Sequence, residues 1–191
     1  MRHLSVFNNV SVDGFFTDAN SDMSWAHAGA DDPEWQEFTR GNVRGGSELL
    51  FGRKTYDMMS TAWSTPEAMK RAPEVADRMK HSPKVVFSHG CDPLWSNTRC
   101  VTGDPATEVR KMKELPGDTE PMTILGSGTI VSQLAQAGLI DTVTLVVVPV
   151  IVGKGRTLFE GVDRRIVLKP TSTRAFANGR VVTTYAVGGA A

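Results

Sequence analysis

Apolar and polar positions follow two periods along this chain, and their alternation is typical of an α/β protein. Residues 4–12 place apolar side chains at nearly every second position, which predicts a half-buried strand, although Asn8 and Asn9 interrupt it. A buried amide costs free energy unless it is hydrogen-bonded, so this pair indicates either a site or amides satisfied by their own backbone neighbourhood. Other apolar runs predict strands at residues 47–52, 84–88, 98–102, 122–125 and 141–152, the last with a bend at Pro149.

Helical patterns fill most of the intervals between these strands. Asp-Pro pairs at residues 32–33 and 104–105 combine a capping carboxylate with a proline at the first helical position. Residues 128–138 place apolar side chains at helical spacing and end on Gly138, which can adopt a left-handed stop. Further helices are expected from residues 53 and 73.

Strands alternate with helices until about residue 140, and strands alone follow, including a hairpin around the Asn-Gly pair at 178–179. This order predicts a mostly parallel mixed sheet with helices on both faces and an antiparallel C-terminal hairpin. At 191 residues the chain fits one domain, residues 1–191. Residues 15–30 show no clear period and form the kind of long loop that often serves as a lid.

The charge balance narrows the classes of partner. Lys and Arg number 21, and so do Asp and Glu, so no net field draws the chain toward nucleic acid or an anionic membrane. No apolar run reaches transmembrane length, and residues 1–14 lack the apolar core of a signal peptide. We therefore expect a cytoplasmic protein with a small-molecule partner.

Cysteines and histidines give no sign of a metal site. Cys91 and Cys100 lie nine positions apart, which matches neither a Cys-x-x-Cys pair nor a set of zinc ligands, and the histidines are dispersed. We interpret both cysteines as ordinary thiols and expect no metal.

Three predicted strands end in residues suited to binding an anion. Glycines at 126 and 128 before a helix can present main-chain N–H groups at the positive end of its dipole, and residues 52–55 add two cations to a similar turn. Ser88 and His89 stand at the end of a third strand. Taken singly, each motif is as well explained by a tight turn or a solvated charge. Because ligands gather at the carboxyl ends of parallel strands, the three together favour a nucleotide with separated phosphates, although neither a Rossmann nor a Walker motif is complete.

Six motifs follow one another along the chain: VDG at 12–14, DMSW at 22–25, LFGRKTY at 50–56, KVVFS at 84–88, GSGT at 126–129 and PVIVGKGRTLF at 149–159. Their order resembles the dihydrofolate reductase superfamily. More closely, the chain is similar to stand-alone bacterial proteins related to the C-terminal reductase domain of the riboflavin-biosynthesis deaminase/reductase. The resemblance covers nearly the whole chain and implies a dihydrofolate-reductase-like three-layer fold.

The resemblance also implies an NADPH-binding reductase and roles for particular residues. Arg53 and Thr55 would bind the phosphates of the cofactor, with Lys54 as an additional contact. Ser88 lies where such proteins contact the adenosine 2′-phosphate. Asn8, Asn9 and Phe16 fall near the expected nicotinamide pocket, and the loop through Trp25 resembles a mobile lid. The implied cofactor-binding residues are Asn9, Phe16, Gly52, Arg53, Lys54, Thr55, Ser88, Gly126, Ser127, Gly128 and Thr129.

Departures from dihydrofolate reductase argue against dihydrofolate as the substrate. The pteridine-binding carboxylate would have to be Glu34 or Glu37, its supporting threonine is replaced by Val146, and Val131 replaces an aromatic residue. We therefore expect an NADPH-dependent reductase of an unidentified small polar substrate, with heterocycles of the pterin or riboflavin-pathway type as candidates. The alternative is a non-catalytic NADP(H)-binding sensor or scaffold.

The proton for reduction needs its own source. Asp13, Asp22, Glu34 and Glu37 are the candidate carboxyl groups, and Asp13 before Gly14 has a turn-stabilising role as its simpler explanation. Our hypothesis is protonation through water beneath the lid, with Asp13 and Trp25 as the catalytic candidates. We also expect a homodimer, because the strand at 141–152 is apolar on both faces and no helices follow to cover the last strands.

Overall fold

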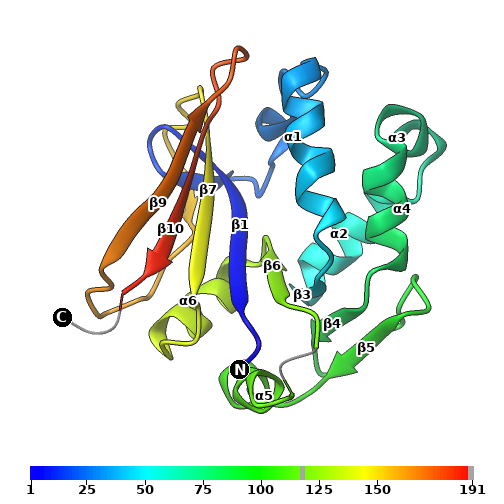
Figure 1. Ribbon diagram of the computed structural model, residues 1–191, viewed down its shortest axis with the longest axis vertical. Helices are drawn as coiled ribbons and strands as arrows, with labels where there is room; N and C mark the ends of the chain where they lie inside the picture. The colour runs from blue at the N-terminus through cyan, green and yellow to red at the C-terminus, as the bar shows by residue number, and fades with distance from the viewer. Residues whose placement is uncertain (117–118, 189–191) are drawn as a thin grey trace.

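An eight-stranded mixed sheet runs through the molecule, with helices on both faces (Figure 1). The computed structural model describes residues 1–116 and 119–188. Six strands are parallel, and the last two form an antiparallel hairpin at one edge. In spatial order the strands are β5 (Thr98–Val101), β4 (Lys84–Phe87), β3 (Glu48–Gly52), β6 (Met122–Leu125), β1 (Leu4–Ser11), β7 (Thr142–Val148), β10 (Val181–Val187) and β9 (Leu168–Ala175).

Two helices begin where the Asp-Pro signals at residues 32–33 and 104–105 predict them. Asp32 accepts a hydrogen bond from the main-chain N–H of Trp35 at 2.9 Å, and Asp104 accepts one from that of Thr107 at 2.8 Å. These bonds satisfy N–H groups that have no acceptor within the helix. The helices are α1 (Pro33–Arg44), α2 (Arg53–Trp63), α3 (Pro66–Arg71), α4 (Pro73–His81), α5 (Pro105–Lys113) and α6 (Gly128–Gln136), with a 3₁₀ turn η1 (Ser24–His27).

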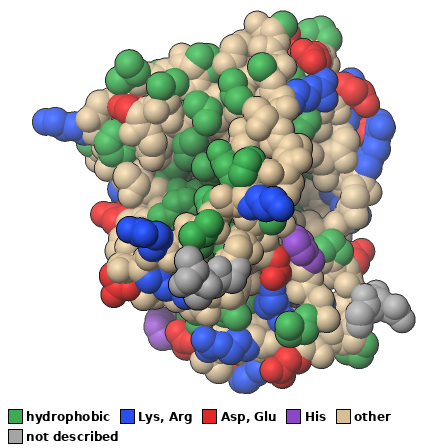
Figure 2. All heavy atoms as spheres, turned by 60° about the vertical axis from the view of Figure 1, so that its left-hand side comes forward, with side chains coloured by type: hydrophobic (Ala, Val, Ile, Leu, Met, Phe, Trp, Pro, Cys, Tyr) green, Lys and Arg blue, Asp and Glu red, His purple; other side chains and the backbone are tan. Residues whose placement is uncertain are grey.

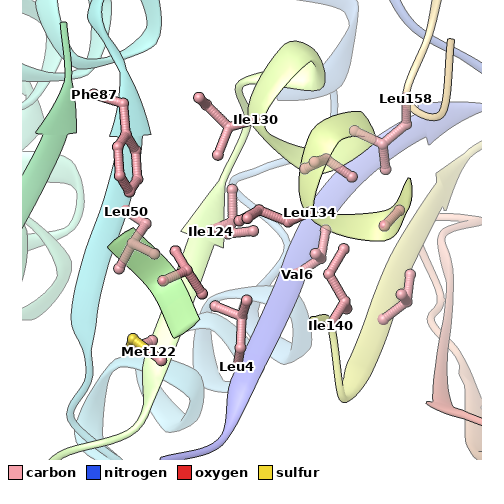
Figure 3. Close-up of a cluster of buried hydrophobic side chains, with 14 of the residues drawn as sticks. Leu4, Val6, Leu50, Phe87, Met122, Ile124, Ile130, Leu134, Ile140 and Leu158 are labelled. Atoms are coloured by element: carbon pink, nitrogen blue, oxygen red, sulfur yellow. The ribbon is translucent and has the colours of Figure 1, made fainter. Parts of the chain in front are cut away.

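The largest core lies between the sheet and the helices α5 and α6 (Figure 3). Val6 on β1 sits between Ile124 on β6 and Val143 on β7, and all three side chains are almost fully buried. Burial of each such side chain contributes about 1.5–3 kcal/mol. Asn8 is the next residue in this row of β1, so an amide stands where the pattern calls for an apolar group.

The opposite face of the sheet carries two further clusters. In one of them, Phe51 of β3 packs against Tyr56 of α2 and Met79 of α4, together with Trp95. A second cluster, which we call the α1 cluster, packs Trp35 against Val146, Val148, Phe176 and Val182, with Trp25 and Phe38 half-buried at its margin. This three-layer arrangement confirms the predicted fold class, and the C-terminal hairpin confirms the Asn-Gly signal.

The structure differs from the sequence-based expectation in several segments. The strand predicted at 141–152 ends at Val148, because Pro149 has no N–H to donate to a ladder. Part of the predicted loop 15–30 is strand β2 (Phe15–Asp18), which pairs with β8 (Gly155–Thr157) in a separate small sheet. Helix α3 lies in a stretch that shows no helical period in the sequence.

The interpretation of the two cysteines as ordinary thiols is wrong. Cys91 and Cys100 form a disulfide with a Cα–Cα distance of 6.2 Å, which lies within the usual range. Strand β5 returns alongside β4 and places Cys100 beside the loop that carries Cys91. Spacing in the sequence does not reveal this contact, because it depends on the pairing of the two strands.

Within residues 1–116 and 119–188, no helix is both long enough and apolar enough to cross a bilayer. The same residues contain no group of three or more His, Cys, Asp or Glu side chains placed to hold a metal ion.

Candidate cofactor site

The glycine turn after β6 is tied to the two strands beside it. The main-chain N–H of Gly126 donates to Oδ1 of Asn8 at 2.9 Å, which joins the turn to β1. The hydroxyl of Ser127 accepts a hydrogen bond from the main-chain N–H of Gly52 at 2.7 Å, which joins it to the end of β3. Gly126 and Ser127 both adopt left-handed backbone conformations, with φ of 67° and 60°. The predicted turns at 52–55 and 126–129 therefore lie side by side.

Close packing explains why glycines occupy this turn. A Cβ atom at Gly126 would lie 2.8 Å from Cγ2 of Thr55, and one at Gly128 would lie 2.7 Å from the ring of Phe16. Since α6 begins at Gly128, the first N–H groups of the helix have no acceptor within it and lie at the positive end of its dipole. Thr129 is exposed in this first turn. The first N–H groups of α6 are suited to an anion, whereas the glycines themselves are required by packing against Thr55 and Phe16.

Arg53 links α2 to the loop after β4. Its Nε donates to both carboxylate oxygens of Asp57, at 2.9 and 2.7 Å, and its Nη1 donates to the carbonyl of Gly90 at 2.6 Å. The hydroxyl of Ser88 donates to the same carbonyl at 2.7 Å. The structure thus brings the third predicted strand end next to the first two. A guanidinium has five N–H donors, so these contacts leave donors for a phosphate, and exposed Lys54 lies beside it in the chain.

Asn8 and Asn9 point to opposite faces of β1, and each has an unpartnered polar atom. Asn8 is only 3% exposed, and its Nδ2 has no hydrogen-bond partner in the described part of the chain. The same holds for Oδ1 of Asn9, which lies beside Val146 in the register of β1 and β7. An unsatisfied buried group costs about 1–3 kcal/mol, so a ligand that supplied partners here would remove that cost.

Trp25 lies in η1 on the side of β1 that faces α1. It is half-buried against the α1 cluster, and its indole Nε1 has no hydrogen-bond partner within the described residues. The predicted lid is therefore ordered in contact with the sheet, and it presents a buried donor.

Asp13 holds the turn that follows β7. Its Oδ1 accepts hydrogen bonds from the hydroxyl of Ser11 at 2.6 Å and the N–H of Val152 at 3.1 Å, and its Oδ2 accepts one from Gly153 at 2.7 Å. The Ser11 hydroxyl and these main-chain groups lower the pKa of Asp13 to about 2, from an ordinary value of 3.8. The carboxylate is ionised at neutral pH, and its geometry favours the turn-stabilising role that the sequence left open.

Asp13 makes stability depend on pH in a predictable direction. A carboxyl group whose folded-state pKa is lowered stabilises the fold above its unfolded pKa and loses that contribution as pH falls through the folded value. We expect Asp13→Asn to lower Tm at pH 7, and we expect the difference from the wild type to shrink between pH 3.8 and about 2. Thermal melts across this range test it. A difference that is constant from pH 7 to pH 2 would contradict the assignment.

With this geometry established, the comparisons with known proteins identify the family. Residues 2–182 match the RibD C-terminal domain family. The chain belongs to that family. The Bacillus subtilis (strain 168) protein YyaP, itself uncharacterized, is 28% identical over 178 residues, which are 92% of this chain and 90% of YyaP.

Solved structures show the same fold. A candidate riboflavin biosynthesis protein from Shewanella sp. PV-4 superposes with a TM-score of 0.74 at 17% identity, covering 98% of this chain and 99% of that one. A deaminase/reductase from Thermotoga maritima, diaminohydroxyphosphoribosylaminopyrimidine deaminase/5-amino-6-(5-phosphoribosylamino)uracil reductase, gives 0.69 at 14% identity over 98% of this chain and 57% of that one. These matches confirm the dihydrofolate-reductase-like fold of a RibD C-terminal domain.

In this member of the RibD C-terminal domain family, the carboxylates of α1 are paired with arginines. Glu34 accepts a hydrogen bond from Arg174 of β9 at 2.8 Å, and Glu37 forms salt bridges with Arg40 and Arg44. Both carboxylates are exposed. Neither contact places a carboxylate against the sheet, where Val146 is fully buried beneath α1.

Two groups at this candidate site are not among the residues predicted from the sequence. Asp57 pairs with Arg53 at a spacing of four residues on α2, and that spacing is a sequence signal for a helical ion pair. The carbonyl of Gly90 accepts hydrogen bonds from Arg53 and Ser88. It has no signal in the sequence, because every residue carries a main-chain carbonyl.

Proposed function

We propose that this RibD C-terminal domain protein is an NADPH-dependent reductase of a small polar heterocycle, with residues 1–191 forming a single reductase domain. The observation that carries the proposal is the joining of three strand ends. A hydrogen bond between Ser127 and Gly52 joins the end of β6 to the end of β3. Arg53 and Ser88 both donate hydrogen bonds to the Gly90 carbonyl, which joins the end of β3 to the end of β4. Three anion-binding turns at one edge suit a cofactor with separated phosphates.

The contacts of each turn suggest how the cofactor would be held. Arg53 and Ser88, with Lys54 nearby, would receive the 2′-phosphate, which favours NADPH over NADH. The turn from Gly126 to Thr129, together with Thr55 and the N–H end of α6, would receive the pyrophosphate. The unpartnered Nδ2 of Asn8 and the ring of Phe16 beside α6 lie on one face of β1 and suit the nicotinamide end, whose carboxamide oxygen accepts hydrogen bonds. Asn9, predicted for the same pocket, points to the other face of β1, where its Oδ1 lacks a donor in the described residues.

When bound, NADPH would supply a hydride to the carbon of a C=N or C=O bond in the substrate. The electron pair of that bond then needs a proton at nitrogen or oxygen. Asp13 is ionised and cannot donate one at neutral pH, so water held beneath Trp25 is the proposed donor. The Trp25 indole would hold that water through Nε1 and exclude bulk solvent, while Asp13 shapes the neighbouring turn at residues 152–153.

The names of structural relatives suggest the class of substrate. The Thermotoga protein is named as a reductase of a substituted uracil, and a structure from Corynebacterium diphtheriae with a TM-score of 0.64 is named as pyrimidine reductase-like. We propose a pyrimidine- or pterin-like heterocycle. The assay is NADPH oxidation in the presence of pterins, pyrimidines and quinones, with NADPH binding measured separately by calorimetry. Binding without oxidation of any of these compounds would favour the sensor or scaffold.

Trp25 provides a test within the enzyme. Trp25→Phe keeps an aromatic ring but removes the indole N–H, so we expect turnover to fall about tenfold or more while NADPH affinity stays within a few-fold. Trp63→Phe is the matched control, since Trp63 is half-buried at the end of α2, away from η1. Unchanged turnover in Trp25→Phe would refute this placement of the catalytic centre.

We also propose a homodimer. Figure 2, which brings the β9–β10 side of the molecule forward, shows hydrophobic side chains gathered in a hollow with charged side chains around it. Val12 and Ile151 are 60% and 75% exposed and lie in segments joined by a hydrogen bond from Val12 to Val150. Exposed apolar area of this kind suits a second copy of the chain. Light scattering should give twice the chain mass, and a monomer at micromolar concentration would count against the dimer.

A further inference from the structure

The tip of the C-terminal hairpin holds the segment of residues 24–30, which contains η1. Nη2 of Arg180, the residue just before β10, donates to the carbonyls of Ala26 at 2.9 Å and Ala28 at 2.6 Å. Asn178, in the hairpin turn, donates from Nδ2 to the carbonyl of Gly29 at 3.1 Å. Three main-chain carbonyls of the segment thus receive donors from residues about 150 positions later in the chain.

Arg180 is an unusual residue to bury at this position. It is 1% exposed, and within residues 1–116 and 119–188 it forms no salt bridge with a carboxylate. Its guanidinium carbon lies 4.7 Å from the centre of the Trp35 ring, and its Nε has no hydrogen-bond partner in the described residues. A buried charge is costly unless it is well hydrogen-bonded. Here carbonyl dipoles, an indole face and the charge of the nearby Asp32 carboxylate provide the stabilisation.

The contacts of Arg180 connect the segment to the body of the protein. Trp35, beneath the guanidinium, belongs to the first turn of α1, and its N–H is bound by Asp32. Trp25 lies next to Ala26 in the chain and packs at the margin of the α1 cluster. The guanidinium therefore holds the main chain on both sides of His27 while leaving the indole N–H of Trp25 free of protein partners in the described residues.

We propose that Arg180 is a positioning residue for the candidate active site: it fixes residues 24–30, and with them Trp25, without touching cofactor or substrate. The effect on substrate rests on the function proposed above, whereas the effect on the segment does not. A guanidinium suits this task because its planar donors can reach two carbonyls at once and it stays charged at any physiological pH.

The direct test is hydrogen exchange of the amides in residues 26–30 for Arg180→Met. We expect exchange there to rise at least tenfold at temperatures far below Tm, and chymotrypsin cleavage after Trp25 to accelerate by a similar factor. Arg174→Met is the matched control, since Arg174 lies on the same hairpin, stacks over Phe176 at 4.5 Å and binds Glu34. The control should leave exchange in residues 26–30 unchanged.

Arg180→Lys keeps the charge with a different donor geometry and guards against a failure of the methionine variant to fold. We expect its hydrogen exchange in residues 26–30 to lie between that of the wild type and that of Arg180→Met, because lysine would restore part of the hydrogen bonding to the segment. For a substrate that the wild type reduces, Arg180→Met should raise KM or lower kcat at least fivefold relative to the wild type. The Kd for NADPH should stay within twofold of the wild-type value.

Exchange in residues 26–30 that matches the control, or that rises only in step with global unfolding, overturns the proposal. Faster exchange with unchanged KM and kcat overturns the link to the active site. If the wild type turns over no substrate, the proposed function fails, and the exchange comparison still decides whether Arg180 holds the segment.

Discussion

Replacing Arg53 with alanine should weaken NADPH binding at least tenfold and change NADH binding less than threefold. The guanidinium already meets the Gly90 carbonyl beside Ser88, so a 2′-phosphate at this edge would gain a charge-assisted contact that NADH lacks. Hydrogen bonds to charged groups contribute about 1.5–3 kcal/mol, and 1.4 kcal/mol is a factor of ten in affinity. Titration calorimetry with both cofactors measures the two effects.

Two further variants sharpen this test. Arg99→Ala is the control, because Arg99 is an exposed arginine on neighbouring β5 whose partner is Glu48, away from the glycine turns. Asp57→Asn removes the carboxylate that binds Nε of Arg53, so it should leave NADPH affinity unchanged or raise it. Equal losses for NADPH and NADH in Arg53→Ala would contradict the assignment of Arg53 to the 2′-phosphate.

Gly126→Ala should be the most damaging small substitution at the candidate site. A left-handed backbone costs a residue with a Cβ about 1–2 kcal/mol, and the new methyl group would also crowd Thr55 at 2.8 Å. Together we expect a loss of about 2–4 kcal/mol, or roughly 5–15 °C in Tm. NADPH affinity should fall at least tenfold, because the turn would move away from β3. Thermal melts and NADPH titration measure both effects.

Gly161→Ala isolates the backbone part of this effect. Gly161 has φ of 83°, and a Cβ there meets no atom within 4 Å, so it carries the left-handed cost without the crowding. Thr55→Ser removes the crowded methyl group, and adding it to Gly126→Ala should recover part of the loss. If Gly126→Ala resembles Gly161→Ala in both stability and NADPH affinity, close packing at Thr55 is not what the turn requires.

Features that depend on neighbouring residues were predictable from the sequence. The capped starts of α1 and α5, the alternation in β1 and the Asn-Gly hairpin arise from interactions within a few residues, so their signals are local. The residue types of the candidate site were also predictable, since glycines before a helix and cations after a strand indicate anion binding. Their roles in cofactor binding stay predictions.

Features that depend on distant residues were decided only by the folded structure. Gly126 meets Asn8 across 118 positions, Ser127 meets Gly52 across 75, and Arg180 meets Ala26 across 154. Strand β2 and the Cys91–Cys100 disulfide likewise follow from pairing with elements formed elsewhere in the chain. A short polar or irregular segment carries no period that names its partner, and main-chain carbonyls are the same in every residue. Which groups meet is therefore set by the order of strands in the sheet, where the buried apolar rows of β1, β6 and β7 fix the register.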